Sequence, residues 1–403
     1  MLTPFSGKIP SHIPKELVLS YPLHLGVTTY DNPYETLIPA IHKMPPAFWA
    51  PDADTGIAPA WVFRRAKDIN RIFADTEHFS SKSAPFSQLI GESWDMLPLE
   101  ADPPNHRHYR MLLLPFLTPA KISQMDARLR GHARYYAQRF RDNGGCDFVS
   151  EFAARFPVAV FLELFGLPIE EIEQFLQWEN DLFHEPDINK IGASVREIKS
   201  YIMAEVNDRK AAPKDDLISY LTHGKVNNRA ATDEEIWGLC FTLYAGGLDT
   251  VATSLGWYFR HLATHPKDQE ILRSSPEIIP RATEEFLRRY SVTTLSRKCI
   301  KPIKIGEASL EPGDKVILPT PLGSNDPEEY EDPYKFDLYR KSRHMAFGSG
   351  IHSCVGFHLA RREIHIAFEE ILAIIPNFTI AQSSRILTGM GSVISQKNLP
   401  LVW

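Results

Sequence analysis

The chain of 403 residues has no surplus of positive charge, few cysteines and no long apolar run. Lysine and arginine together number 44 against 50 aspartates and glutamates, and this formal charge of −6 argues against a protein whose main partner is nucleic acid. No run approaches the roughly 18 apolar residues that a membrane span needs, and the first residues show no signal-peptide core. We therefore expect a soluble, cytoplasmic protein with neither a membrane nor a nucleic-acid partner.

The four cysteines lie far apart and show no paired spacing. This excludes a zinc motif and the disulfide framework of a small secreted protein, and it favours reduced thiols. A fixed-period repeat and a low-complexity tract are also missing, which excludes a repeat architecture. With 43% hydrophobic and 23% charged residues, the composition is that of a globular protein with a large core.

Most of the chain has helical periodicity, with apolar residues recurring at spacings of three and four. The clearest stretches are 122–140, 170–183, 193–208, 234–263 and 357–374. Strand-like stretches are few, at 60–64, 295–305, 315–319 and 385–402, and a long irregular segment rich in proline, aspartate and glycine occupies 319–343. We predict one mainly α domain over 1–403, a helix-rich body with one minor β region formed by about 55–65, 295–319 and 385–402.

The strongest local signal is the run Phe347-Gly348-Ser349-Gly350-Ile351-His352-Ser353-Cys354-Val355-Gly356. It is a glycine-rich loop that leads into the helix predicted at 357–374. Because a helix N-terminus adds positive potential and glycines let backbone N–H groups approach the sulfur, the position of Cys354 suits a thiolate that binds iron. The alternative is a buried structural cysteine beside a glycine turn. A dinucleotide site is discounted, because Ser353 replaces the third glycine of that fingerprint and no strand–helix–strand unit surrounds it.

A second motif, Ala245-Gly246-Gly247-Leu248-Asp249-Thr250-Val251, lies in the middle of the longest predicted helix. Two glycines inside a helix cost about 1 kcal/mol each relative to alanine, so something should require them. A cofactor face close to the backbone at Gly246 is one reason. The Thr250 hydroxyl can turn toward the helix carbonyls and loosen the hydrogen-bond ladder, and Asp249 can relay protons. The alternative is a packing seam with a solvated aspartate.

The run from Phe347 to Gly356 resembles the haem-binding signature of the cytochrome P450 family, F-G-x-G-x-H-x-C-x-G, at every fixed position. Further landmarks occur in the family's order over nearly the whole chain and are most similar to those of the bacterial camphor hydroxylases. They are Asp102-Pro103-Pro104, 246–250, Leu359-Ala360-Arg361-Arg362-Glu363 and Leu399-Pro400-Leu401-Val402-Trp403. The resemblance implies the P450 fold around haem b, with Cys354 as the iron ligand and Phe347, Gly348, Gly356 and Gly246 beside the haem.

The resemblance also implies roles for polar side chains outside the loop. It assigns Asp249 and Thr250 to proton delivery during oxygen activation. It makes Glu285 and Arg288 a buried anchor that holds the cysteine loop together with Arg340 or its neighbours, although an exposed pair of this type is worth at most about 1 kcal/mol. Cations at positions that contact the haem propionates are His106, Arg110, Arg297 and His352. The alternative for any one of these four is an ordinary surface cation.

The resemblance places the substrate pocket at six positions, which are Trp94, Thr242, Ala245, Thr293, Ser392 and Val393. Trp94 stands where camphor hydroxylases carry the tyrosine that donates a hydrogen bond to the ketone, and tryptophan differs from it in bulk and reach. Three of the positions carry hydroxyl groups in place of aliphatic wall residues. A more polar, reshaped pocket predicts a small apolar terpenoid or norisoprenoid substrate other than camphor.

The resemblance implies a monooxygenase that hydroxylates an unactivated C–H bond with dioxygen. Because the sequence shows no fused reductase and no nicotinamide motif, we expect the electrons to come from a two-iron two-sulfur ferredoxin, itself reduced by a flavin reductase. A basic patch for an acidic ferredoxin, or merely a solvated surface, would consist of Arg107, Arg110, Lys341 and Arg343. Two alternatives are a peroxide-driven peroxygenase and a non-enzymatic haem-thiolate binding or sensor protein, and neither requires Asp249 and Thr250.

Overall fold

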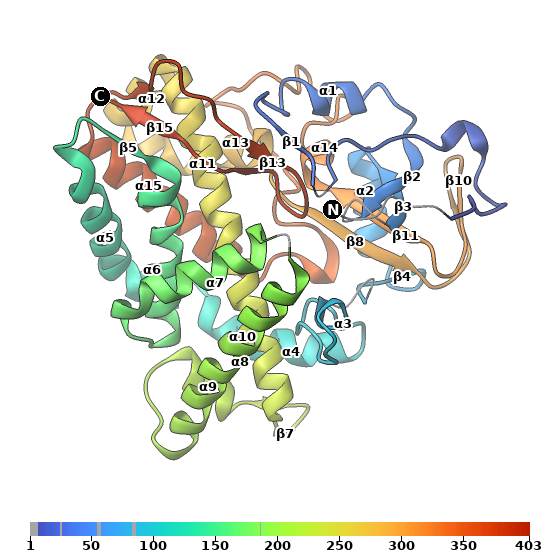
Figure 1. Cartoon of the computed structure of the whole chain (residues 1–403), viewed down its shortest axis with the longest axis horizontal. Coiled ribbons are helices and arrows are strands. Elements are labelled where there is room, and N and C mark those ends of the chain that lie inside the picture. Colours follow the sequence, from blue (N-terminus) through green and yellow to red (C-terminus); the bar gives the residue numbers. More distant parts are fainter. Residues whose placement is uncertain (1–6, 25, 55–57, 83–85, 186) are drawn as a thin grey trace.

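The computed structural model describes residues 7–24, 26–54, 58–82, 86–185 and 187–403. Figure 1 shows a large helical part beside a smaller part that contains the long strands. The smaller part combines N-terminal elements, drawn in blue, with the later strands β8 and β11, drawn in orange. The prediction of a mainly α fold with a minor β component is confirmed.

The helices account for most of the predicted periodic stretches. Their bounds are α1 (Leu37–Ile41), α2 (Ala66–Ala74), α3 (Phe86–Leu89), α4 (Asn105–Leu113), α5 (Pro119–Arg141), α6 (Arg155–Phe165), α7 (Ile172–His184), α8 (Ile188–Ala211), α9 (Leu217–Thr222), α10 (Asp233–Gly247), α11 (Asp249–Thr264), α12 (Pro266–Ser274), α13 (Ile279–Arg289), α14 (Thr320–Ser324) and α15 (Phe357–Ile374). The stretch predicted at 357–374 is α15, whereas the one predicted at 234–263 is divided into α10 and α11 at Leu248. α14 lies within the segment predicted as irregular.

Local sequence signals explain where the central helices begin. Thr232 and Glu235 form a reciprocal capping box at the start of α10, in which the Thr232 hydroxyl accepts from the Glu235 N–H and the Glu235 carboxylate accepts from the Thr232 N–H. Thr118 caps α5, and Pro119 follows at the first helical position, where a missing N–H costs nothing. These caps fix the register of the helices that carry the site.

The strands are distributed over several small sheets. Their bounds are β1 (Thr28–Thr29), β2 (Ala47–Asp54), β3 (Ala58–Phe63), β4 (Phe79–Ser80), β5 (Gly145–Asp147), β6 (Lys225–Val226), β7 (Arg229–Ala230), β8 (Thr294–Cys299), β9 (Ile303–Ile305), β10 (Ala308–Leu310), β11 (Lys315–Pro319), β12 (Thr379–Ile380), β13 (Thr388–Gly389), β14 (Ser395–Gln396) and β15 (Pro400–Val402). The largest sheet has the order β2-β3-β11-β8-β4, in which only β3 and β11 pair in parallel.

Two details of this sheet differ from the sequence prediction. The stretch predicted at 295–305 is interrupted, because Pro302 cannot donate a ladder hydrogen bond, so β8 ends at Cys299 and β9 pairs only with β10 in a separate hairpin. β2 was not predicted. It contains Pro51 at an irregularity between Ala50 and Asp54, which is where a strand at the edge of a sheet tolerates proline.

The prediction of one minor β region is wrong for residues 385–402. β13 and β14 pair with β1, and β15 pairs with β12 and β5, so these strands belong to two further sheets. Period-two alternation marks a strand but does not name its partner, and strands of two or three residues take whichever edge their chain path reaches. Residues 55–57 of the predicted β region lie outside the described residues.

The hydrophobic core has a large cluster in the helical part and a smaller one between the main sheet and α2. The smaller cluster includes Trp49, Trp61 and Phe63, so the sheet is packed on a core of its own. Among the described residues, no helix is both long and apolar enough to cross a membrane.

Candidate cofactor site and active site

Cys354 lies at the end of the glycine-rich loop, directly before α15. The loop turns at Gly348 and Gly350, which have φ values of +63° and +71°. A side chain at Gly350 would not fit, because its Cβ would lie 2.5 Å from the carbonyl oxygen of Phe73 in α2. The backbone N–H of Cys354 donates to the carbonyl of Phe347 over 2.8 Å. The loop therefore fixes Cys354 between α2 and α15.

The surroundings of the Cys354 sulfur have opposing effects on the pKa of its thiol. Burial raises the pKa of the thiol, whereas the backbone N–H of Gly356 and the charges of Arg110 and Arg361 act to lower that pKa. N–H groups and cations favour the thiolate over the thiol. A metal ion bound to the sulfur would add a larger charge of the same sign and complete the deprotonation.

The four cationic side chains predicted for the propionates come together beside this loop. His106 and Arg110 lie on one side of α4, while Arg107 is exposed. The His106 and His352 rings are 4.2 Å apart between centroids. Burial, together with the charges of Arg297, His106 and Arg110, lowers the pKa of His352 to about 3. Burial alone lowers the pKa of Arg297 to about 10, with Asp102 acting in the opposite direction.

Several nitrogen atoms in this group are buried without a hydrogen-bond partner in the part of the chain that the structure describes. They are His106 Nε2, Arg297 Nη2 and His352 Nε2. Leaving a buried polar group unpaired costs about 1–3 kcal/mol, and gathered cations repel each other. A ligand with two carboxylates would pair these nitrogens and reverse the repulsion. The residues present therefore fit a dianionic cofactor such as haem b.

Arg110 also contacts the cysteine loop itself. Its Nη1 donates to the carbonyl of Ser353 over 2.7 Å, and its Nη2 donates to the Ser353 hydroxyl over 3.4 Å. Arg110 is half-buried, so it is not a member of an exposed basic patch as the sequence predicted. Arg107, Lys341 and Arg343 are exposed.

The break between α10 and α11 exposes backbone in a helix whose neighbours are buried. Gly246 and Gly247 are exposed, and a Cβ added at either would meet no atom within 4 Å. The Thr250 hydroxyl donates to the Gly246 carbonyl over 2.8 Å, which is the back-bond predicted from the sequence. Open space therefore runs along this face of the helix. The protein's own described atoms therefore leave room for a side chain at both positions.

Asp249 is the first residue of α11. Its side chain lies among buried polar residues, on the side of the helix away from the open face. It is 3% exposed and accepts a hydrogen bond from Thr253 over 3.2 Å. Burial raises the pKa of Asp249, and the positive charge of Lys397 opposes that rise. Burial and the charge of Asp249 also raise the pKa of Glu179 in α7. Glu179 and Lys397 were not predicted, because no motif connects residues so far apart in the chain.

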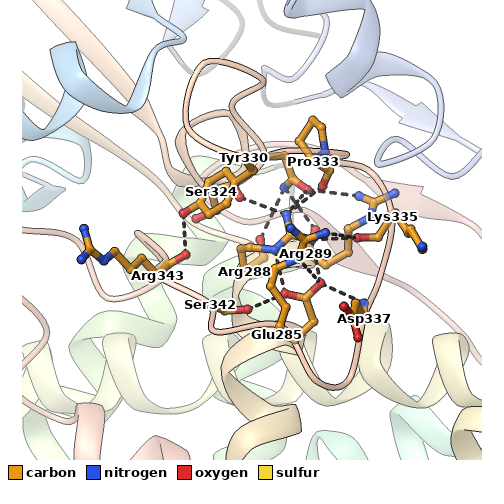
Figure 2. A network of polar contacts seen from close by, with 12 residues as sticks. Glu285, Arg288, Arg289, Ser324, Tyr330, Pro333, Lys335, Asp337, Ser342 and Arg343 are labelled. Atoms are coloured by element: carbon orange, nitrogen blue, oxygen red, sulfur yellow. Dashed lines mark hydrogen bonds and ion pairs between the residues drawn. The ribbon is translucent and has the colours of Figure 1, made fainter.

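The Glu285–Arg288 pair of α13 forms the centre of a buried network, which Figure 2 shows from close by. Both side chains are 0% exposed, and two nitrogens of Arg288 each lie 2.8 Å from an oxygen of Glu285. Arg288 donates to the carbonyls of Ser324, Pro333 and Lys335. Glu285 accepts from Asp337 N–H, Arg340 and Ser342. The pair thus binds much of the irregular segment that precedes the cysteine loop.

Trp94 has a different environment from the one expected of a substrate-binding donor. Its indole N–H donates to the Glu92 carboxylate over 2.6 Å. Its ring packs edge-on against Trp237 and Phe241, and less closely against Phe86. The aromatic neighbours were missed, since Trp237 and Phe241 lie in α10, far from Trp94 in the chain. On the outer side, a pocket of about 390 Å³ is lined by residues that include Trp94 and Trp237.

The two threonine hydroxyls of the predicted pocket are bonded within the protein. Thr242 donates to the Gly238 carbonyl over 2.8 Å, and the Thr293 hydroxyl lies 3.0 Å from that of Thr320. Thr293 also forms a β-bridge with Val393, and the Ser392 carbonyl accepts from Thr294, so the C-terminal segment meets the start of β8. Ala245 is half-buried in α10. The pocket walls therefore expose less free polarity than their sequence indicates.

Comparison with known proteins gives the same family at every level. Residues 169–385 match the family model described as Cytochrome P450. A probable cytochrome P450 127A1 of Sinorhizobium fredii is 34% identical, covering 99% of this chain and 97% of its own length. A linalool 8-monooxygenase of Pseudomonas putida is 27% identical over 86% of this chain and 89% of its own. The crystal structure of CYP101C1 superposes with a TM-score of 0.89 at 29% identity, covering 98% and 100% of the two chains.

Proposed function

The chain belongs to the cytochrome P450 family of monooxygenases, and from this premise we propose that Cys354 is the thiolate ligand of haem b in a ferredoxin-dependent hydroxylase. When bound, the haem activates dioxygen and supplies the oxidant for the C–H bond. One observation carries the proposal, namely the position of Cys354 beside His106, Arg110, Arg297 and His352, three of which, all but Arg110, have a buried nitrogen without a hydrogen-bond partner among the described residues.

These four side chains would hold the two propionates. Arg297 and His352 present nitrogens without partners in the described chain, and His106 lies against His352. Phe347, Gly348 and Gly356 would flank the haem on the cysteine side, and Gly246 would approach it from α10. Pairing with carboxylates would raise the lowered pKa values of the two histidines and Arg297, since an opposite charge favours the protonated form.

Asp249 and Thr250 would handle the protons that the reaction consumes. The Thr250 hydroxyl lies at the open face of the helix. When its hydrogen bond to the Gly246 carbonyl breaks, the hydroxyl can hold its proton toward the open space. Asp249 is buried beside it with a raised pKa, so its carboxyl can carry a proton near neutral pH. The two residues together provide a short path from the buried polar group to the open face.

The substrate in this proposal is a small apolar terpenoid or norisoprenoid. Trp94, Phe86 and Phe241 form an apolar aromatic cluster, and the Thr242 and Thr293 hydroxyls are already bonded. The similarity to a linalool 8-monooxygenase supports the terpenoid class. Because Glu92 occupies the Trp94 N–H, a ketone would not be bound by that group. Titration with neutral terpenoids should shift the haem spin state, whereas matched compounds that carry a charge should not.

A carbon monoxide difference spectrum of the reduced protein tests the ligand assignment. The wild-type protein should show the red-shifted band of thiolate-ligated haem, and Cys354→Ser should lose it. Cys146→Ser is the matched control, because Cys146 is also half-buried but lies in β5, and it should keep the band. Retention of the band by Cys354→Ser, or its absence from the wild type, would overturn the proposal.

A further inference from the structure

Arg361 of α15 is held against the cysteine loop by Glu284 of α13. Its Nε and Nη2 lie 2.6 and 2.9 Å from the two carboxylate oxygens of Glu284, a bidentate arrangement. His344 adds a third contact to Glu284, at 3.1 Å. These three side chains are distinct from the Glu285 network, and the sequence analysis assigned no role to any of them.

The guanidinium of Arg361 also stacks on two aromatic rings of the site. Its Cζ lies 4.7 Å from the centroid of the Phe347 ring and 5.4 Å from that of Phe357. The carbonyl of Phe347 accepts the N–H of Cys354 over 2.8 Å. Arg361 therefore packs on the residue that holds the cysteine backbone, and its orientation is fixed by both the rings and the carboxylate.

Both members of the pair carry their full charge in this position. Burial acts to raise the pKa of Glu284, but the hydrogen bonds from Arg361 and His344 outweigh it and lower that pKa to about 2. The side chains are only 27% and 30% exposed, so solvent screens them less than it screens a surface pair. Arg361 packs on the Phe347 ring, and the Phe347 carbonyl accepts the Cys354 N–H, so the positive charge of Arg361 lies beside the backbone that holds the sulfur. This charge also acts to favour the Cys354 thiolate.

We propose that the Arg361–Glu284 pair sets the reduction potential of the haem through the Cys354 thiolate. This inference rests on the proposed role of Cys354 as the iron ligand. A positive charge near the sulfur withdraws electron density and stabilises the reduced state, which carries one more negative charge. Glu284 counteracts that charge in part. Arg361 is thus a positioning residue, whose charge and distance determine how readily the first electron is accepted.

The two members of the pair should act in opposite directions in a potentiometric titration of the holoprotein. Arg361→Gln removes the positive charge and should lower the potential, whereas Glu284→Gln leaves Arg361 uncompensated and should raise it. For one charge at an effective dielectric constant of about 20, we expect a roughly three- to tenfold change in the ratio of oxidised to reduced protein at fixed applied potential. That corresponds to about 30 to 60 mV for one electron. Arg361→Lys keeps the charge and should shift the potential less than Arg361→Gln.

Arg362→Gln is the matched control. Arg362 is the next residue and is equally buried, at 26% exposed, but it pairs with Asp126 of α5 and lies 3.8 Å from Glu369. This variant loses the same charge on the face of α15 that meets α5, and its reduction potential should change less than that of Arg361→Gln. A common shift of Arg361→Gln and Glu284→Gln in one direction, which general loosening of the loop would produce, would overturn the inference. So would an equal shift in Arg362→Gln.

The carbon monoxide band separates this result from the previous one. All the variants above keep Cys354 and should show the thiolate band, which also confirms that they have folded around haem. If the wild type lacks the band, the proposed ligand is wrong. If the band is present throughout but the potentials do not separate, the ligand assignment stands and the role of the Arg361–Glu284 pair is refuted.

Discussion

Two adjacent residues, Asp249 and Thr250, lie directly after the interruption at Leu248 and point into different surroundings. The Thr250 hydroxyl bonds back to the Gly246 carbonyl at the open face, whereas Asp249 is buried with Thr253. The Gly246 carbonyl at the exposed face thus accepts from a hydroxyl, while the Asp249 carboxyl is buried, and in the proposed function these two side chains handle the protons.

Removal of the Thr250 hydroxyl should uncouple electron use from product formation. We expect Thr250→Ala to lose product per electron pair by on the order of tenfold, since a positioned proton donor contributes at least that much, while electron consumption continues. Thr264→Ala is the control, because Thr264 makes the same back-bond, to Arg260 over 3.0 Å, at the far end of α11. Product yield and hydrogen peroxide release are the measurements. Unchanged coupling in Thr250→Ala would contradict the assignment.

A buried histidine away from the site predicts how stability depends on pH. His261 is 2% exposed, and its ring nitrogens lie 2.8 Å from the Asp268 carboxylate and from the Tyr290 hydroxyl. Burial lowers the pKa of His261 to about 4. Between about pH 6.5 and 4 the unfolded state therefore binds a proton that the folded state excludes, and stability is lost as the pH falls through this window.

The loss from His261 amounts to at most about 3 kcal/mol, at about 1.4 kcal/mol per unit of pKa. His261→Gln has no such proton to bind. Its free energy of unfolding, measured with urea at pH 7, 5.5 and 4, should therefore decline less steeply than that of the wild type. Two parallel pH profiles would show that His261 titrates normally in the folded protein.

At the scale of single residues, the sequence identified chemistry better than geometry. The Cys354 loop and the four predicted propionate contacts could be expected to lie together, because each belongs to a motif or to a position that matches the family pattern. The hydrogen-bond partner of the Trp94 indole was not predicted. The carboxylate of Glu92, two residues earlier, accepts the indole N–H and so competes for it with any ligand. Glu179 and Lys397 reach Asp249 from distant elements, and nothing in their local sequence indicates burial.

At the scale of elements, the Glu285–Arg288 pair shows how one helix organises a segment without regular structure. Two side chains of α13 satisfy backbone groups between 324 and 337 that a loop would otherwise expose to water (Figure 2). Removing one partner would leave the other buried and unpaired. The irregular segment and the cysteine loop after it depend on both.

Arg288→Ala and Glu285→Ala should each destabilise the protein by about 3–5 kcal/mol, the cost of an uncompensated buried charge. As the stability falls, the fraction of protein that shows a thiolate-type carbon monoxide band should fall too. Glu173→Ala is the control, since Glu173 pairs with Arg155 at 2.6 Å but is 70% exposed, and it should cost less than about 1 kcal/mol. Urea unfolding measures both. An equal loss of stability in the buried Glu285–Arg288 pair and the exposed Glu173–Arg155 pair would show that burial does not determine the cost of breaking an ion pair.

Helices were predictable and strand partners were not, for physical reasons. The periodicity of α5, α8 and α15 comes from a single apolar face, which a local pattern contains in full. A strand's partner depends on the path of another segment, as when β15 pairs with β5, more than two hundred residues earlier. The two glycines and Thr250 indicated a loosened hydrogen-bond ladder near Leu248, but not that the helix divides there, because the residues on either side keep helical spacing.

At the scale of the whole molecule, the cysteine loop is supported from both parts seen in Figure 1. From the smaller part, α2 contacts Gly350, and β8 contributes Arg297. From the helical part, α4 contributes Arg110, and α15 begins at the loop. Any change in how the two parts pack would therefore alter the surroundings of Cys354.

The charge on the exposed surface near the cysteine loop should determine how a ferredoxin binds. The chain carries a formal charge of −6, yet Arg107, Lys341 and Arg343 are exposed near the loop, and the Arg343 guanidinium extends away from the network in Figure 2. Reversing one of these charges, as in Arg107→Glu, should raise the KM for an acidic ferredoxin on the order of tenfold at low salt and leave substrate binding unchanged. Salt near 1 M should abolish the difference, because it reduces the screening length to about 3 Å. Lys304→Glu makes the same change in charge on the β9–β10 hairpin and should have little effect. A similar rise in KM for both variants would mean that net charge, and not this surface, steers the donor.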